Sequence, residues 1–370
     1  MIQDITPKVF KNQFKNHAPR PEDTAFVFNG QDLMISGSTE SGISFPKVSD
    51  FIRDEEAEFV YLFEISGKNY FLVRGVDHPD IKGFHWDNNK ILRCENPKDE
   101  CFAGETALHL YTWYSNNAFC GHCGKPTFFV EGMRALECPK CKNRIFPHIA
   151  PAVIVGVVNP NHDKIVITRF NQRTYRGTAL ISGFCEIGES AESAIVREVE
   201  EEVGLKVKNI RYYGSQPWGF DGCLLFGYFA EVDGSITIRR QKDELAAADW
   251  VSRDDIPVTS DPMSLTNEMI MFFKDPKLFE NALKLPPPEK KEEVDEKPAT
   301  IIETKKVEIL SENNMLDNKK TALTANPATA LKVAEDAADD AVDDESEDIL
   351  STDLHKLEKQ VQRYKKKHRK

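Results

Sequence analysis

The chain has 370 residues, of which 40% are hydrophobic, and a formal net charge of -12. This length allows two or three domains, and the negative charge argues against a protein that binds nucleic acid through its overall charge. No apolar run approaches the ~20 residues of a membrane span, and the N-terminus lacks the apolar core of a secretion signal. We therefore expect an intracellular, soluble protein in the cytoplasm, with the peroxisome and the nucleus as alternatives.

Residues 1–115 are predicted to form an N-terminal α/β domain. Apolar runs at 24–29 and 58–76 predict strands, and the sequence SGKN inside the second run predicts a hairpin turn. The apolar residues within 105–117 predict a helix that leads to the next segment.

Residues 116–148 contain two cysteine pairs with the spacing of a metal site. Two residues separate the members of each pair, and fourteen residues separate the pairs. This spacing is typical of a zinc ribbon, in which four thiolates surround one ion. The alternatives are a redox pair or buried thiols without metal. Four protein ligands would close the coordination sphere, so we expect one structural zinc per chain, held by Cys120, Cys123, Cys138 and Cys141.

Residues 149–285 are predicted to form a layered α/β domain, because β-branched runs alternate with two helical segments. The strands are expected at 152–170, 211–218, 223–232 and 249–252. The helices are expected from Ser190, a good N-cap, to about Val203, and from about Ser264 to Leu285. Residues 286–370 have charged blocks that rarely fold alone, and we expect a disordered tail. Its basic end, KKKHRK, fits a solvated surface, with a nuclear-import or RNA-contact patch as the alternative.

Three glutamates, Glu198, Glu201 and Glu202, fall on one face of the first of these helices. Like charges at this spacing repel each other, so the face is either simply solvated or binds something positive. Carboxylates are the oxygen ligands that Mg²⁺ and Mn²⁺ prefer. These acids are therefore candidate ligands for a divalent metal ion.

The stretch GFCEIGESAESAIVREVEEEVGL, residues 183–205, has the pattern G-x5-E-x7-R-E-V-x-E-E-x-G-L. It resembles the Nudix box, the signature of hydrolases that cleave a nucleoside diphosphate linked to another moiety. The resemblance implies an α/β/α sandwich with a mixed sheet. It also implies that the acids act together with Arg197, which would orient one of them, with Glu189 as its partner. The catalytic set is then Glu189, Arg197, Glu198, Glu201 and Glu202.

The stretch SQPWGFDGCLL, residues 215–225, resembles the SQPWPFP signature of the NADH pyrophosphatase branch, whose members also hydrolyse NAD-capped RNA. That branch has a four-cysteine zinc ribbon before the Nudix domain, and AFCGHCG and IFPHIAPAVIV also look like its sequences. This chain differs at three positions, because Gly219 and Asp221 replace prolines and Cys223 replaces a serine. Glycine frees a backbone that proline fixes, and Asp221 adds negative charge to the substrate pocket.

By position, the resemblance implies a Mg²⁺ or Mn²⁺ site made by the Ser182 carbonyl, Glu198, Glu202 and Glu244. The implied substrate pocket comprises Phe146, Phe184, Gln216, Pro217, Trp218, Gly219, Phe220, Asp221, Gly222, Cys223 and Glu244. Phe146 and Phe184 would stack on a base or nicotinamide ring, and core packing is their alternative role.

The function implied is hydrolysis of the central diphosphate of NAD(H) to AMP and nicotinamide mononucleotide, with removal of NAD caps from RNA 5′ ends. The resemblance also implies a homodimer, and the lack of a long apolar run argues against a membrane partner. One alternative is a pyrophosphatase for another nucleoside diphosphate derivative. The other is a non-catalytic zinc-ribbon protein that binds RNA or reads nucleotides.

Overall fold

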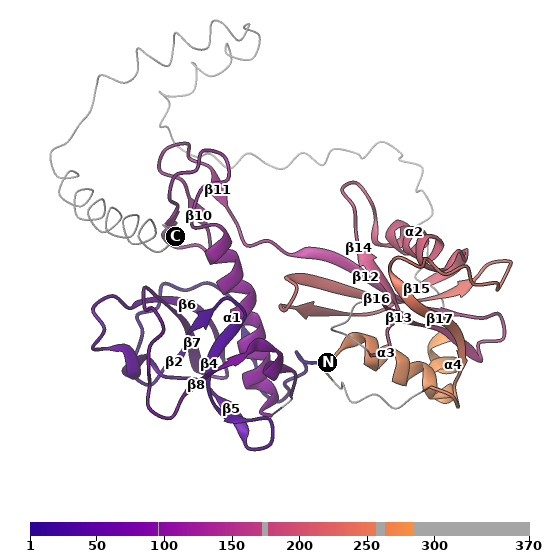
Figure 1. Ribbon diagram of the computed structural model, residues 1–370, viewed down its shortest axis with the longest axis horizontal. Helices are drawn as coiled ribbons and strands as arrows, with labels where there is room; N and C mark the ends of the chain where they lie inside the picture. Colours follow the sequence, from indigo (N-terminus) through magenta and orange to yellow (C-terminus); the bar gives the residue numbers. More distant parts are fainter. Residues whose placement is uncertain (95, 172–176, 257–262, 285–370) are drawn as a thin grey trace, which may run out of the picture. The chain divides into compact units, whose positions relative to one another are not determined.

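The computed structural model describes residues 1–94, 96–171, 177–256 and 263–284 (Figure 1). The chain divides into two compact units, Met1–Lys291 and Glu292–Lys370. All described residues belong to the first unit, and the predicted tail at 286–370 lies outside them. None of the described helices is long and apolar enough to cross a membrane.

The N-terminal region contains two small sheets. The first has the order β1-β6-β7-β2, and its strands are Phe10–Lys11, Glu58–Ile65, Lys68–Arg74 and Thr24–Phe26. The second joins β3 (Phe28–Asn29), β4 (Asp32–Ser38), β5 (Gly42–Ser44) and β8 (His85–Asn88). The predicted hairpin is confirmed, since β6 and β7 pair antiparallel around Ser66 and Gly67, both with positive φ. Two short 3-10 helices, η1 (Val48–Phe51) and η2 (Asn89–Cys94), complete the region.

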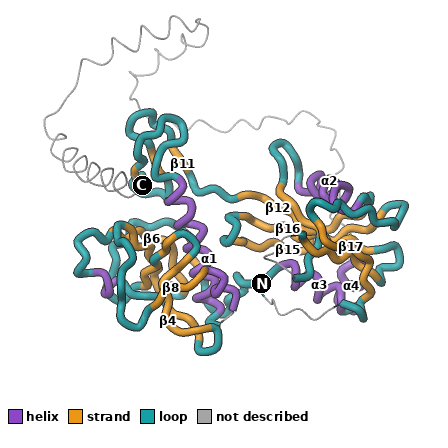
Figure 2. The backbone as a smooth tube through the Cα atoms, viewed as in Figure 1, coloured by secondary structure: helices purple, strands orange, loops and turns teal. Residues whose placement is uncertain are grey.

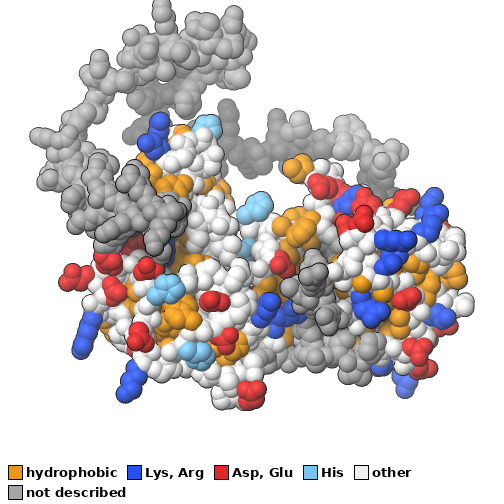
Figure 3. All heavy atoms as spheres, in the orientation of Figure 1, with side chains coloured by type: hydrophobic (Ala, Val, Ile, Leu, Met, Phe, Trp, Pro, Cys, Tyr) orange, Lys and Arg blue, Asp and Glu red, His pale blue; other side chains and the backbone are white. Residues whose placement is uncertain are grey.

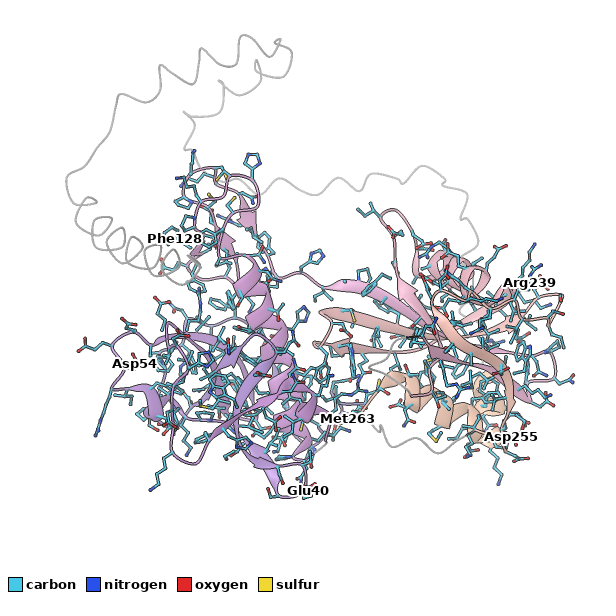
Figure 4. The ribbon with its side chains drawn as sticks, in the orientation of Figure 1. Glu40, Asp54, Phe128, Arg239, Asp255 and Met263 are labelled. Atoms are coloured by element: carbon cyan, nitrogen blue, oxygen red, sulfur yellow. The ribbon has the colours of Figure 1, made fainter. Side chains whose placement is uncertain are left out.

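Helix α1, Lys98–Asn116, leads from this region to the cysteine segment. It begins seven residues earlier than predicted, because Pro97 has an extended backbone and Asp99 and Glu100 fill the first turn. After α1 come three two-residue strands in the order β11-β10-β9: Arg144–Ile145, Leu136–Glu137 and Phe128–Phe129. Figure 4 labels Phe128 beside β10.

A mixed six-stranded sheet follows. Its order is β15-β16-β12-β13-β17, with β14 also paired to β12. The strands are β12 (Ala150–Val158), β13 (Lys164–Phe170), β14 (Ile181–Phe184), β15 (Val207–Trp218), β16 (Cys223–Val232) and β17 (Leu245–Ser252). Only the β12–β16 pair is parallel among the described pairs of this sheet.

Helices cover both faces of this sheet, as Figures 1 and 2 show. Successive residues of β12 point to opposite faces. Val153, Val155 and Val157 therefore pack with α2 (Ala191–Val203), whereas Ile154 and Val158 pack with α3 (Leu265–Lys274) and α4 (Pro276–Lys284). The predicted α/β/α sandwich with a mixed sheet is confirmed.

The prediction of one long C-terminal helix from Ser264 is wrong, because the segment forms two helices. Asp275 has an extended backbone (φ -86°, ψ 105°), and Pro276 starts α4. Proline has no N–H for the bond that would continue α3, but it fits the first turn of a new helix.

Candidate active site and metal centres

Local sequence signals fix both ends of α2, the helix that carries the clustered glutamates. Ser190 caps the N-terminus, where its side chain accepts a hydrogen bond from the Ser193 N–H at 3.1 Å. Gly204 ends the helix in the left-handed region (φ 65°), and its N–H donates to the Glu200 carbonyl at 3.0 Å. The predicted helix is confirmed with these caps. Figure 3 shows acidic and basic side chains together over α2.

Arg197 is hydrogen-bonded to three of the predicted catalytic acids. Its Nε and Nη2 each donate to one carboxylate oxygen of Glu189 at 2.9 Å, a bidentate pair. Its Nη1 donates to Glu198 at 2.7 Å and to Glu201 at 3.1 Å. The hydrogen bonds from Arg197 hold the pKa of Glu189 below its usual value. Through these hydrogen bonds, Arg197 connects Glu189 in the loop before α2 to the acidic face of the helix.

Glu198 reaches back from α2 onto strand β14. A Cβ added to Gly183 would overlap the Glu198 carboxylate in its present position, so a larger residue there would require the carboxylate to move. Burial raises the pKa of Glu198, and Arg197 opposes that rise. The carboxylate is therefore held against the β14 backbone, next to the predicted carbonyl ligand Ser182.

Glu202 is the most deeply buried acid of the cluster, with 1% of its surface exposed. One oxygen accepts a long hydrogen bond from the Ser182 N–H at 3.5 Å, and the other has no partner. Burial raises the pKa of Glu202 to about 8, and the nearby charges of Glu198, Glu244 and Glu201 add to the rise. Such a group needs either a proton or a cation, so its surroundings fit a divalent metal ion.

Glu244 lies in the turn just before β17, and its exposed carboxylate raises the pKa values of Glu198 and Glu202. The structure thus brings Ser182, Glu198, Glu202 and Glu244 into one neighbourhood. Within the described ranges, however, only the four cysteines bring three or more ligand atoms within 4.8 Å of one another. The glutamate oxygens do not meet this limit in the structure, and Arg197 donates hydrogen bonds to Glu198 and Glu201. Their assignment as ligands stays a prediction.

The four predicted zinc ligands converge. Their sulfur atoms all lie within 4.8 Å of one another, with Cys120–Cys141 at 3.6 Å and Cys123–Cys138 at 3.5 Å. Tetrahedral zinc with bonds of about 2.3 Å places its sulfurs about 3.8 Å apart, so the cluster fits this ion. Backbone N–H groups of the second knuckle lower the pKa of Cys138, Cys141 N–H foremost, which favours the thiolate that zinc binds. No position remains for a substrate, and the zinc is structural.

The two cysteine knuckles have matching backbone geometry. The Gly124 N–H donates to the Cys120 carbonyl at 2.8 Å, and the Lys142 N–H donates to the Cys138 carbonyl at 2.9 Å. Gly124 and Lys142 both have positive φ, 68° and 59°. The first knuckle has the glycine that this turn favours, while the second places a lysine in the same conformation.

Phe146 and Phe184 are exposed, by 58% and 54%, so the alternative that they are core residues is wrong. Strand register places Phe184 at one end of the sheet, while Phe146 lies between β11 and β12. Ala152 on β12 is opposite Phe184 on β14, and Ala150 is opposite Cys223 at the start of β16. Phe184 therefore lies at the end of the sheet where the predicted substrate segment turns, and the exposure of both rings leaves them accessible for stacking.

Gln216, predicted to line the substrate pocket, is fully buried instead. Its Nε2 donates to the Met263 carbonyl at 2.7 Å, and its Oε1 accepts from the Leu265 N–H at 2.7 Å (Figure 4, where Met263 is labelled). These bonds connect β15 to the start of α3. In this structure no face of Gln216 is open to a ligand, and a substrate contact there stays a prediction.

The rest of the predicted pocket segment is a compact loop. The Trp218 Nε1 donates to Asp221 at 3.0 Å, and the rings of Trp218 and Phe220 lie 4.9 Å apart. The guanidinium of Arg93 lies 5.2 Å above the Trp218 ring. Asp221 is therefore engaged inside the loop. The substrate roles of Pro217, Trp218, Gly219, Phe220, Asp221, Gly222 and Cys223 stay predictions.

The sequence analysis missed Glu105, which contacts this loop from α1. Its carboxylate accepts a hydrogen bond from the Gly219 N–H at 2.6 Å, and only 2% of the residue is exposed. A signal was available, because Glu105 falls at helical spacing between buried Cys101, Phe102 and Leu108. A single acid on an apolar helical face indicates a buried polar contact.

Known protein families resemble this chain over both the acidic helix and the cysteine cluster. A NUDIX domain model matches residues 148–271, and an NADH pyrophosphatase zinc ribbon domain model matches residues 115–146. The "NAD-capped RNA hydrolase NudC" of Pseudomonas putida is 33% identical over 220 residues, which cover 59% of this chain and 78% of that protein. The proteins of the same name from Klebsiella pneumoniae and Salmonella typhi are 36% and 37% identical over 164 residues, covering 44% of this chain and 62% of each. The matched ranges contain the four cysteines and the whole of α2.

Proposed function

The chain belongs to the Nudix family of the NAD-capped RNA hydrolases named NudC, and we propose that it hydrolyses the diphosphate of NAD(H) and of NAD caps on RNA. Water adds across the central P–O–P linkage, so that one P–O bond forms and one breaks. Free NAD(H) then gives AMP and nicotinamide mononucleotide. A capped RNA gives nicotinamide mononucleotide and a 5′-monophosphate end.

The observation that carries this proposal is the buried, unpartnered carboxylate oxygen of Glu202 among other acids. Glu198, Glu202, Glu244 and the Ser182 carbonyl would hold Mg²⁺ or Mn²⁺. Ions bound there would supply Lewis-acid stabilisation of the phosphates and would lower the pKa of an attacking water. A protein that binds nucleotides without hydrolysing them would not require a buried carboxylate, whose burial costs folding free energy.

The chain's own residues supply positioning and proton transfer. Arg197 fixes Glu198 and Glu201 relative to the loop of Glu189, so the acids keep one geometry while substrate binds. The exposed faces of Phe146 and Phe184 would hold the rings of the dinucleotide by stacking. The general base is one of Glu198, Glu201 and Glu202.

AMP release from NADH, with Mg²⁺ or Mn²⁺, tests the proposal. Wild type should turn over, while Glu201→Gln and Glu202→Gln should lose most of the rate. Glu192→Gln is the matched control, because Glu192 is an exposed acid in the first turn of α2. Equal rates for wild type and both variants would exclude the proposed role of these acids.

Substrate choice needs a second comparison. Free NADH, NAD-capped RNA and a panel of other nucleoside diphosphate derivatives are given to the same preparation, and kcat/KM values are compared. Hydrolysis of the other derivatives but not of NADH or capped RNA would favour a pyrophosphatase with a different substrate. Binding of the nucleotides without hydrolysis would favour a non-catalytic nucleotide-binding protein.

We also propose a homodimer located in the cytoplasm. The resemblance of the SQPWGF segment to the NADH pyrophosphatase signature supports the dimer. Light scattering coupled to gel filtration tests it, and fractionation of cells that express the tagged chain tests the compartment.

A further inference from the structure

Two backbone groups of the loop between β15 and β16, Trp218–Cys223, form hydrogen bonds with other elements, one with β12 and one with α1. The Ala150 N–H of β12 donates to the Gly222 carbonyl at 3.0 Å. The Gly219 N–H donates to Glu105 Oε1 of α1 at 2.6 Å. The first bond extends the pairing of β12 with β16, but the second comes from a different part of the chain.

Gly219 and Glu105 fit each other closely. A Cβ on Gly219 would overlap the Glu105 carbonyl and lie 3.0 Å from its Cγ. Any other residue would therefore push the loop away from α1. The signature that this segment resembles has proline at this position, and proline has neither the N–H nor the space for this contact. In this chain the Gly219 backbone is free of the restriction that proline imposes on φ, and its N–H is hydrogen-bonded to a buried acid.

We infer that Glu105 is a positioning residue, which holds the Trp218–Cys223 loop in its substrate-binding conformation through the Gly219 N–H. This inference rests on the proposed function, since it assigns the loop to the dinucleotide. Glu105 itself does not touch the substrate.

The charged and titratable groups around Glu105 are consistent with a protonated, neutral carboxyl group that forms a hydrogen bond. Arg93 and Asp221 act on it with opposite signs, Cys223 lies within its electrostatic reach, and His109 lies one turn further along α1, beside Gly222. Burial raises the pKa of Glu105 to about 8, so the carboxyl is mostly protonated at neutral pH. Glutamine has the same shape as a protonated carboxyl and can accept the same hydrogen bond.

Steady-state kinetics on NADH with Mg²⁺ test the inference with three variants. Glu105→Ala should raise KM about tenfold, the equivalent of one lost buried hydrogen bond, with kcat within about threefold of wild type. Glu105→Gln should restore KM. Gly219→Pro, although it restores the signature, should raise KM as Glu105→Ala does, because it removes the N–H and overlaps α1.

Thr112→Ala, an exposed change on the same helix, is the control and should match wild type. If Glu105→Ala does not fold, Glu105→Gln and Gly219→Pro carry the test. An unchanged KM in Glu105→Ala and Gly219→Pro, or a Glu105→Gln variant as weak as Glu105→Ala, would overturn the inference.

Hydrogen exchange separates this inference from the proposed function. The peptide that contains Gly219 should exchange faster in Glu105→Ala than in wild type and Glu105→Gln, whether or not NADH is the substrate. If wild type shows no turnover but this exchange pattern holds, the proposed function fails while the loop contact stands. If turnover is present and exchange is equal in all variants, Glu105 does not position the loop.

Discussion

Glu202 combines burial with an oxygen that lacks a hydrogen-bond partner, and each property alone is costly for a carboxyl group. A bound Mg²⁺ or Mn²⁺ ion would remove that cost. A ligand that binds only the folded form stabilises it in proportion to its affinity. The residue should therefore report metal binding even in the absence of substrate.

We predict that Mn²⁺ or Mg²⁺ raises the melting temperature of wild type and of Glu192→Gln but not that of Glu202→Gln. Without metal, Glu202→Gln should melt at least as high as wild type, because a buried ionisable group is removed. Differential scanning fluorimetry across a metal titration measures both effects. A wild-type metal shift that persists in Glu202→Gln would exclude Glu202 as a ligand.

Glu105 gives the stability of the protein a pH dependence. Burial raises its pKa to about 8, from 4.5 in an unfolded chain. Between these values the folded form holds more protons, so this contribution to the free energy of unfolding is full below about pH 4.5 and is lost as the pH rises to about 8. The slope is at most about 1.4 kcal/mol per pH unit.

Glu105→Gln, which cannot ionise, should flatten that slope. Urea unfolding of wild type and variant at several pH values measures it without metal, so that Glu202 contributes equally to both proteins. If the free energies of unfolding of the two proteins differ by the same amount from about pH 5 to about pH 8, the prediction is contradicted.

At the scale of elements, the zinc ribbon has a small hydrophobic core of its own. Its strands have two residues each, and among the described hydrophobic residues Phe119, Phe128, Phe129 and Met133 are exposed. So small a module has too little core to fold by burial alone. Metal loss should therefore unfold it locally.

We predict that Cys138→Ser lowers the zinc content from one ion per chain and increases hydrogen exchange throughout residues 115–146. The melting temperature should fall as well. Elemental analysis and exchange mass spectrometry measure these effects, with Cys185→Ser, which lies outside the cluster, as the control. Equal zinc in wild type and Cys138→Ser would refute the four-cysteine site.

The sequence was sufficient for elements whose signals are local. Ser190 and Gly204 mark the ends of α2, and the four cysteines mark the ribbon, because a cap or a ligand spacing depends on neighbouring residues. The break at Pro276 also had a local signal, which the apolar periodicity around it concealed. The early start of α1 at Lys98 was missed because its first turn is acidic rather than apolar.

Contacts between distant segments could not be predicted in this way. Gln216 has the position of a substrate residue in the signature, yet its partners are Met263 and Leu265, 47 and 49 residues away. Glu105 and Gly219 are 114 residues apart. Only the folded sheet and α1 together bring such pairs into contact, and no periodicity records them.

At the scale of the whole molecule, Gln216 connects three segments of the first compact unit. It bonds to the turn and first residue of α3, and its Nε2 also lies 3.4 Å from the Gln3 side chain. The Ile2 N–H donates to the same Met263 carbonyl at 3.1 Å. The N-terminal residues, β15 and α3 thus share one buried polar junction.

We predict that Gln216→Ala costs about 1–3 kcal/mol of unfolding free energy, because the buried Leu265 N–H loses its acceptor, while the Met263 carbonyl keeps the Ile2 N–H as a donor. Lys208→Ala, an exposed change on the same strand, should cost little. Urea unfolding measures both variants. If Gln216→Ala keeps full stability but raises KM, Gln216 is a substrate residue in the working enzyme and the junction is not required.

The fit between Gly183 and Glu198 restricts how this protein can change during evolution. The carboxylate occupies the volume of the side chain that Gly183 lacks, so a larger residue at 183 would displace the Glu198 carboxylate from its present position. A shorter acid at 198 would relieve that restriction but would withdraw the carboxylate from β14. A substitution at either position should therefore move the acid relative to β14 and Arg197, and its effect should depend on the residue at the other position.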